Sequence, residues 1–97
     1  MQMHFEFEGE IFEWRGPAPH YFVAVPQEQS RDLKAIQPMV TYGWGVIPAQ
    51  VQIGDTLFTT SLFPRGDRFL VPIKVSVRKS EQLEKGDVVK VQLVVVC

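Results

Sequence analysis

The chain has 97 residues, 45% of them apolar and 22% charged, a composition that suits one small globular domain and argues against disorder. Ten Lys and Arg against eleven Asp and Glu give a net charge of −1, which argues against a general polyanion binder. The single cysteine, Cys97, leaves no disulfide framework or cysteine-rich zinc site, and no apolar run is long enough for a membrane helix. We therefore expect a single cytoplasmic domain that spans residues 1–97 and does not contact a membrane.

Strand patterns dominate the chain. Apolar and acidic residues alternate from Phe5 to Ile11, which predicts a half-buried strand, and the apolar phase slips at Phe12, where we expect a bulge or a strand end. Further strands are predicted at residues 21–25, 47–53, 56–63, 69–72 and 89–95. Glycine-containing loops or turns are predicted at 16–19, 42–45, 54–55, 64–67 and 86–87. Pro48 is expected to place its strand near a sheet edge.

Two short helices are predicted between these strands. Apolar residues at helical spacing indicate a helix over residues 27–37, and Pro38 is expected to bar its continuation. Residues 73–85 fit two patterns. Strict apolar alternation from Phe69 to Val77 favours one long strand, whereas Lys74 and Arg78, at i and i+4, favour a helix with a basic face.

An internal repeat favours the helix. Phe22-Val23-Ala24-Val25-Pro26 parallels Arg68-Phe69-Leu70-Val71-Pro72, and the copies later reach the strands Val51-Gln52-Ile53 and Val91-Gln92-Leu93. Because residues 27–37 are predicted to be helical, residues 73–82 are predicted to be helical too. We therefore expect a mainly β fold with two short helices. Its two pseudo-repeats, about 3–53 and 55–96, would bury their apolar faces against each other in one small barrel.

Five segments follow one another in a distinctive order: Gly43-Trp44-Gly45, Ile53-Gly54-Asp55-Thr56, Thr60-Ser61-Leu62-Phe63-Pro64, residues 71–79 and Gly86-Asp87-Val88. This order resembles that of a family of small uncharacterised bacterial domains of unknown function. Its hallmarks are the Thr-Ser-Leu-Phe-Pro strand end and a proline-lysine-arginine helix, represented here by Pro72, Lys74 and Arg78. The resemblance implies a double-split β-barrel related to AbrB/MazE-type regulators, with both halves supplied by one chain. Some members of that family carry a YdeI/OmpD-associated (bacteriocin-protection-like) domain beside this one.

Lys74 and Arg78 are the strongest candidates for a binding site. Their spacing places two positive charges on one helix face near the helix start, where the helix dipole also attracts anions. If the barrel brings Thr60 and Ser61 opposite them, Arg78 could bind a carboxylate or phosphate through two N–H groups. The alternative is that Arg78 pairs with an acidic neighbour and only fixes the helix. Trp44, between two glycines, could stack on a ligand or plug one end of the barrel.

Motifs for catalysis or metal binding are not found in the sequence. His4 and His20 lack metal-ligand spacing, and the serines lack a Gly-x-Ser-x-Gly elbow. Three alternating glutamates indicate a solvated strand face or a protected edge rather than catalytic carboxylates: Glu6, Glu8 and Glu10. Five aromatic residues are expected to belong to the core: Phe12, Trp14, Phe58, Phe63 and Phe69.

We therefore expect no cofactor, no metal and no enzyme activity. The favoured function is a module that binds a small anionic ligand or a protein partner, as a monomer or a small homo-oligomer. Its predicted binding residues are Trp44, Thr60, Ser61, Lys74 and Arg78. An AbrB-like DNA-binding or regulatory domain is the first alternative, and its predicted contacts are Arg65, Arg68, Lys74, Arg78 and Lys79. An enzyme of unknown reaction is the last alternative.

Overall fold

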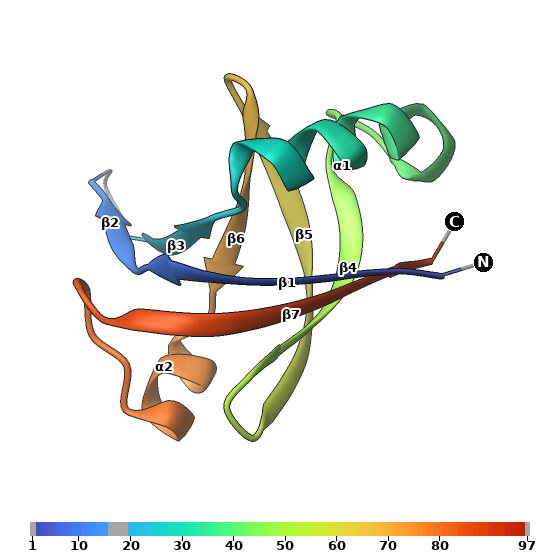
Figure 1. The fold of residues 1–97 in the computed structure, drawn as a ribbon. Coiled ribbons are helices and arrows are strands. Elements are labelled where there is room, and N and C mark those ends of the chain that lie inside the picture. The colour runs from blue at the N-terminus through green and yellow to red at the C-terminus, as the bar shows by residue number, and fades with distance from the viewer. Residues whose placement is uncertain (1, 16–19, 97) are drawn as a thin grey trace.

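The strands form one curled antiparallel sheet, with α1 at the top and α2 at the bottom of the molecule as Figure 1 shows it. This computed structural model describes residues 2–15 and 20–96. Its elements are β1 (Gln2–Glu10), β2 (Phe12–Trp14), β3 (His20–Ala24), α1 (Gln27–Val40), β4 (Ile47–Ile53), β5 (Thr56–Arg65), β6 (Arg68–Ile73), α2 (Val75–Glu81) and β7 (Val88–Val96). The strand order across the sheet is β1-β7-β4-β5-β6-β3-β2. The prediction of a mainly β fold with two helices is confirmed.

Cys97 and the loop predicted at residues 16–19 lie outside the described residues. Among the helices that the structure describes, none is both long enough and apolar enough to cross a membrane.

The alternating sequence of β1 follows from its pairing with β7. The two strands pair antiparallel along their whole length. Phe5 and Phe7 are buried in the core, whereas Glu6, Glu8 and Glu10 are exposed on the other face. The predicted half-buried strand is therefore confirmed.

The chain changes its strand partner at Ile11. Before Ile11 it pairs with β7, and after it the chain pairs with β3, near the other end of the sheet. Ile11 donates its N–H to the carbonyl of Asp87 (2.8 Å) and accepts the N–H of Gly86 (2.8 Å), and its side chain is only 1% exposed. The break predicted after Ile11 is confirmed, and it brings the two ends of the curled sheet together.

β5 also pairs with two strands. Residues up to Leu62 pair with β4, and residues 63–65 pair with β6. In the pairing of β4 with β7, Gln52 lies opposite Gln92, and in that of β3 with β6, Ala24 lies opposite Leu70. In each of these pairs, the sequence repeat aligns the two residues with each other. Equivalent residues lie opposite each other when two repeat units are related by a twofold axis, so the register fits such a relation. The double-split barrel and the pseudo-repeats at 3–53 and 55–96 themselves remain predictions.

The core lies on the inner side of the curled sheet and includes Phe69, with Phe58 packed against it. Three of the five aromatic residues predicted for the core are elsewhere. Phe12 and Phe63 are half-buried and Trp14 is exposed, and all three make ring contacts with Phe22. The prediction is wrong for them because hydrophobicity alone does not tell which face of a strand is covered.

The first helix is longer than predicted. α1 continues through Pro38 to Val40, so the expectation that Pro38 would end it is wrong. Proline removes only its own N–H, which would otherwise bond to the carbonyl of Lys34. Lys34 is exposed, where water can bond to that carbonyl, and the N–H of Thr41 bonds to the carbonyl of Gln37 (3.0 Å) and closes the last turn.

The second helix is confirmed, but it begins two residues later than predicted. Ile73 still belongs to β6, where it pairs with Tyr21 of β3, and Lys74 is the N-cap of α2. The strand pairing therefore delays the helix start. Gln82 ends the helix in a left-handed conformation, with a φ of 54°.

Pro48 does not lie on an edge strand, because β4 is flanked by β7 and β5. The expectation is wrong for the strand as a whole, but the residue itself has a strand partner on one side only. β4 pairs with β7 only from Gln50 onward, whereas Pro48 pairs with Ser61 of β5 alone. The proline therefore costs β4 no hydrogen bond to β7.

Replacing Gly9 by alanine tests the closure of the sheet. A Cβ at Gly9 would lie 2.6 Å from Cγ1 of Val23, closer than any real Cβ contact. We expect Gly9→Ala to lower the free energy of unfolding by about 1–3 kcal/mol, because β1 must move away from β3. Each kcal/mol corresponds to about 4–8 °C in Tm for a domain of this size, which calorimetry can measure. Glu8→Ala, at the exposed neighbouring position, is the control, and equal Tm values for the two variants would contradict the close approach.

Candidate functional site

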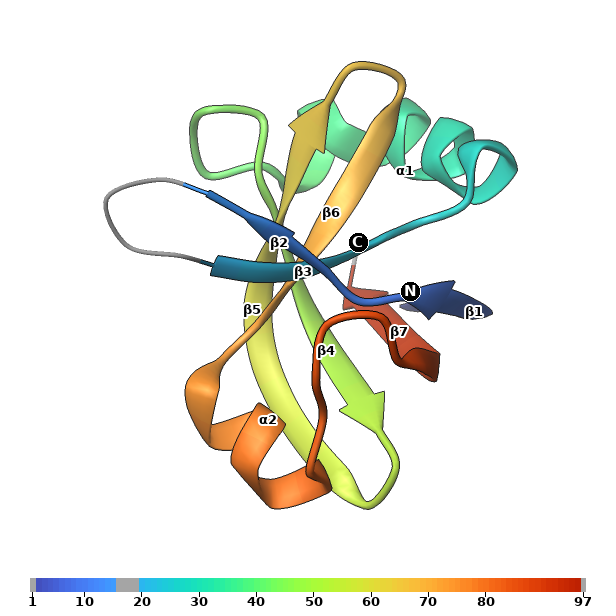
Figure 2. The same cartoon turned by 90° about the vertical axis from the view of Figure 1, so that its left-hand side faces the viewer.

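A groove of about 450 Å³ lies between α1 and the tip of the β5–β6 hairpin. Figure 2 shows this hairpin tip beside α1. The groove is lined by Ser30, Arg31, Lys34, Ala35, Pro64, Gly66, Asp67, Arg68 and Phe69. We call it the α1–hairpin groove.

Ser30 fixes the wall that α1 contributes to this groove. Its hydroxyl is buried, with the residue 1% exposed, and donates to the carbonyl of Val25 (3.1 Å). The same oxygen accepts the backbone N–H of Phe69 on β6 (3.1 Å). At the hairpin tip, the Gln27 amide donates to the carboxylate of Asp67. These bonds tie the first turns of α1 to β6 and to the turn of the hairpin, so the groove is formed before any ligand arrives.

The charged side chains of the groove are mostly positive. Arg31 and Lys34 lie one helical turn apart on α1, and Arg68 stands on the hairpin with its Nε–H bonded to the carbonyl of Val25 (2.9 Å). Asp67 is the one acid among the lining residues, and it is already bonded to Gln27. The arginine guanidinium and lysine ammonium groups are suited to a carboxylate or a phosphate.

Apolar atoms form much of the rest of the groove, chiefly from Ala35, Pro64 and Phe69. Phe69 belongs to the core and is therefore a rigid part of the wall. A groove with an apolar wall and a few charged groups is the usual form of a small-molecule site. The arrangement can hold an anion that carries an apolar body.

The two predicted cations of the second helix are engaged differently. Lys74 is exposed as the N-cap of α2. The guanidinium of Arg78 lies 3.8 Å from the ring centre of Tyr21, a cation–π contact that attaches α2 to β3. Glu81, which could have paired with Arg78, instead accepts a hydrogen bond from Thr56 (2.6 Å). Arg78 thus fixes the helix, through an aromatic ring rather than through an acid.

The other three predicted residues lie away from α2. Ser61 shares a hydrogen bond with Tyr42 in the loop after α1, and Thr60 lines a shallow hollow over β4, β5 and β7. Trp44 is 98% exposed in that loop and does not plug the barrel. Figure 2 places the loop and α2 at opposite ends of the molecule. Within the part of the chain that the structure describes, the five predicted binding residues therefore do not form one site.

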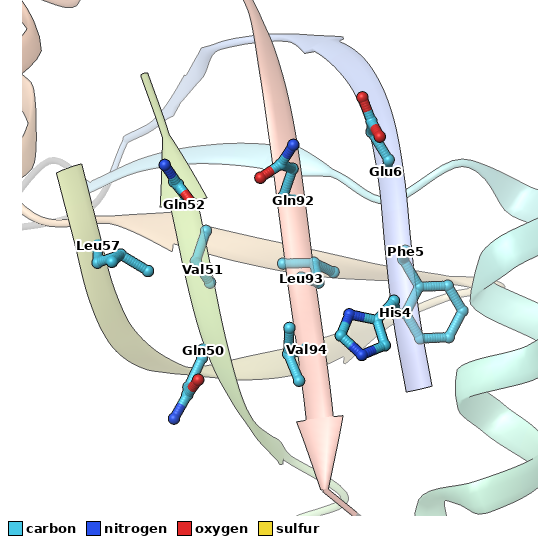
Figure 3. A pocket seen from close by; sticks show the side chains of 10 residues that line it. All are labelled: His4, Phe5, Glu6, Gln50, Val51, Gln52, Leu57, Gln92, Leu93 and Val94. Carbon is cyan, nitrogen blue, oxygen red and sulfur yellow. The ribbon is translucent and has the colours of Figure 1, made fainter. Parts of the chain in front are cut away.

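A second hollow, of about 420 Å³, lies on the outer face of β1, β7, β4 and β5 (Figure 3). Its polar side chains are mainly neutral amides, from Gln50, Gln52 and Gln92. The carboxylate of Glu6 is paired with Lys90 (2.6 Å), and this hydrogen bond, with the negative charge, raises the pKa of Lys90 above 10.5. Among the described residues that line this hollow there is no lysine or arginine to bind an anionic ligand. The α1–hairpin groove is therefore the better candidate.

Metal binding receives no support from the described residues. Within residues 2–15 and 20–96, no three His, Cys, Asp or Glu side chains are placed to hold a metal ion.

The sequence analysis did not single out Arg31 or Lys34. Their one-turn spacing on a predicted helix was visible, but a charged helix face is usually solvated. Arg68 appeared only among the candidate DNA contacts. The three residues become one site only because Ser30 docks α1 on β6.

Replacing Ser30 by alanine tests how the groove is held. We expect Ser30→Ala to lower the free energy of unfolding by about 1–3 kcal/mol, because the buried N–H of Phe69 loses its acceptor. Chemical denaturation measures the loss, and faster hydrogen exchange at the Phe69 amide would locate it. Ser76→Ala, at an exposed position of α2, is the matched control. An unchanged midpoint for Ser30→Ala would show that this bond does not hold α1 in place.

A comparison with protein families places the chain. A family described as "Domain of unknown function (DUF1905)" matches residues 7–93. No match to a curated protein was found. The signature motifs, the AbrB/MazE relation and the domain fusions remain predictions. Because the matched residues cover nearly the whole chain, the protein belongs to the DUF1905 family of domains of unknown function.

Proposed function

We propose that this chain is a non-enzymatic module that binds a small anionic ligand with an apolar body in the α1–hairpin groove. The observation that carries the proposal is the convergence of Arg31, Lys34 and Arg68 on a groove walled by Phe69 and Pro64. The cations would bind the acidic group, and the apolar wall would cover the remainder of the ligand.

The energetics favour a ligand of this mixed character. Hydrogen bonds to charged groups contribute about 1.5–3 kcal/mol each, and buried apolar surface adds about 25 cal/mol per Å². Arg31 and Lys34 are exposed, so a bare inorganic anion would gain little from them in water. The apolar wall supplies the additional affinity and the selectivity. The local positive charge also suits the ligand although the whole chain has a net charge of −1.

The engagement of its candidate cations counts against the DNA-binding alternative. The guanidinium of Arg65 lies 4.1 Å from the ring centre of Trp14, and that of Arg78 lies 3.8 Å from the ring centre of Tyr21. Guanidinium groups held in this way are less free to follow a phosphate backbone.

The lining of the groove also gives little support to the enzyme alternative. The residues that line it include no histidine or cysteine, and the one serine, Ser30, is buried and bonded to backbone groups of Val25 and Phe69. The cytoplasmic location and the oligomeric state remain predictions.

Titration with matched anionic and neutral compounds tests the proposal. Calorimetry and NMR would compare octanoate and phenyl phosphate with octanamide and phenol. We expect only the two anions to bind, with shifts of the amide signals of residues 30–35 and 65–69. The double variant Arg31→Ala/Lys34→Ala should bind at least about tenfold more weakly, a loss of about 1.4 kcal/mol.

The control is Lys74→Ala/Lys79→Ala, which removes the same charge from two exposed positions near α2. It should bind the anions like the unaltered chain. If this variant loses binding while Arg31→Ala/Lys34→Ala keeps it, the ligand site is at Lys74 and Arg78. Equal binding of octanoate and octanamide would contradict an anion site in either place.

A further inference from the structure

A group of aromatic residues covers the outer side of β2, β3 and β5, away from the core. Phe22 is at its centre, with ring centres of Phe12, Trp14 and Phe63 at 5.9, 5.8 and 5.5 Å. Phe22 is only 4% exposed, yet it is not part of the core cluster. These rings therefore form a second apolar cluster, with Trp14 exposed at its border.

The loop after α1 extends this cluster. Ser61 and Phe63 are two residues apart on β5, so their side chains lie on the same face of the sheet. Because Tyr42 shares a hydrogen bond with Ser61, Tyr42 lies on that face as well. Tyr42 is 70% exposed, and the 98% exposed Trp44 belongs to the same loop. We call the surface made by Phe12, Trp14, Phe22, Phe63 and Tyr42, together with the adjoining loop that carries Trp44, the aromatic face.

Trp44 is held outward by an ordered loop. Its backbone has a φ of 60°, a left-handed conformation that bulky residues seldom adopt. The Gln37 amide donates to the carbonyl of Gly45 (2.6 Å), and the N–H of Val46 donates to the carbonyl of Gly43 (3.2 Å). Such strain persists where the surrounding structure enforces it, often at binding sites. Because the backbone that carries the ring is already ordered, less entropy is lost when a partner covers it.

The charge on the aromatic face indicates what would cover it. Arg65 extends over Trp14, and it takes part in no ion pair among the residues that the structure describes. Tryptophan, tyrosine and arginine are also the residues that contribute most binding energy at protein interfaces. We propose that the aromatic face docks an acidic segment of a partner protein, whose carboxylates pair with Arg65 and whose apolar side chains pack on Trp44 and Tyr42.

This geometry favours a protein segment over single-stranded nucleic acid. Bases bind such proteins by stacking on open ring faces, with several cations along the phosphate chain. One face of Trp14 is already covered by Arg65, and its ring also contacts Phe22. A carboxylate can approach the edge of the Arg65 guanidinium without displacing it from Trp14. A second copy of the chain fits less well, because two such faces would bring Arg65 side chains toward each other without an intervening acid.

Selection from a displayed library of random peptides on the folded full chain tests this proposal. We expect enrichment of peptides in which Asp or Glu stands beside Trp, Phe, Leu or Pro. A synthetic peptide of the enriched sequence should change the intrinsic fluorescence, because both tryptophans of the chain are exposed to a docking partner. Trp44→Ala and Arg65→Gln should each weaken its binding by about tenfold or more, and higher salt should weaken it further.

Two controls keep this test separate from that of the ligand groove. Leu57→Ala removes an exposed apolar side chain at the other end of β5 and should leave peptide binding unchanged. Arg31→Ala/Lys34→Ala should also leave it unchanged, so failure of the groove and failure of the aromatic face are distinguishable. Thermal melting confirms that each variant is folded.

Four results would overturn the proposal. The first is enrichment of basic peptides, or of none. The second is peptide binding that survives both Trp44→Ala and Arg65→Gln. The third is tighter quenching of the tryptophans by oligodeoxythymidylate than by the peptide, which would assign the surface to single-stranded nucleic acid. The fourth is a sedimentation measurement in which the unaltered chain dimerises and Trp44→Ala does not, which would assign it to a second copy.

Discussion

The change of strand partner at Ile11 is the constraint on which the rest of the fold depends. One continuous segment pairs first with β7 and then with β3, so it joins the two ends of the curled sheet. Hydrogen bonds to Asp87 and Gly86 hold the bend, and Gly9 allows β1 to pass close to Val23. Without this bend, β2 and β3 would lack their position beside β1, and the inner face of the sheet would not enclose one core.

The position of β3 also determines the two surfaces with which we associate binding. Because α1 follows β3 almost directly, the helix comes to lie against β6, where Ser30 bonds to Val25 and Phe69. That contact creates the groove on the inner side of the helix. The outer side of β3 carries Phe22, around which the aromatic cluster forms. The β5–β6 hairpin contributes to both surfaces, with Arg68 in the groove and Arg65 over Trp14.

Local sequence rules predicted most elements but not the effect of their surroundings. Pro38 lies inside α1 because only one exposed carbonyl loses its donor there, and Pro48 lies in an inner strand because that end of β4 has a single partner. Each proline removes one N–H donor, but the neighbouring strands and the solvent determine whether a hydrogen bond is lost in the folded protein. The spacing of Lys74 and Arg78 was predicted correctly, whereas the contact of Arg78 with Tyr21 was not. Tyr21 lies far away in sequence and reaches Arg78 only through the pairing of β3 with β6.

The sequence by itself determined most of the strands, the two helices, the break after Ile11 and the glycine turns among the described residues, because periodicity and backbone preference are properties of neighbouring residues. It did not determine which strand face is covered, which is why Phe12, Trp14 and Phe63 were placed in the core. Nor did it determine which cations meet: Arg31, Lys34 and Arg68 share a groove only after α1 docks on β6. Charge and stacking interactions act over a few ångströms, and only the register of distant strands and the packing of a helix bring such side chains that close.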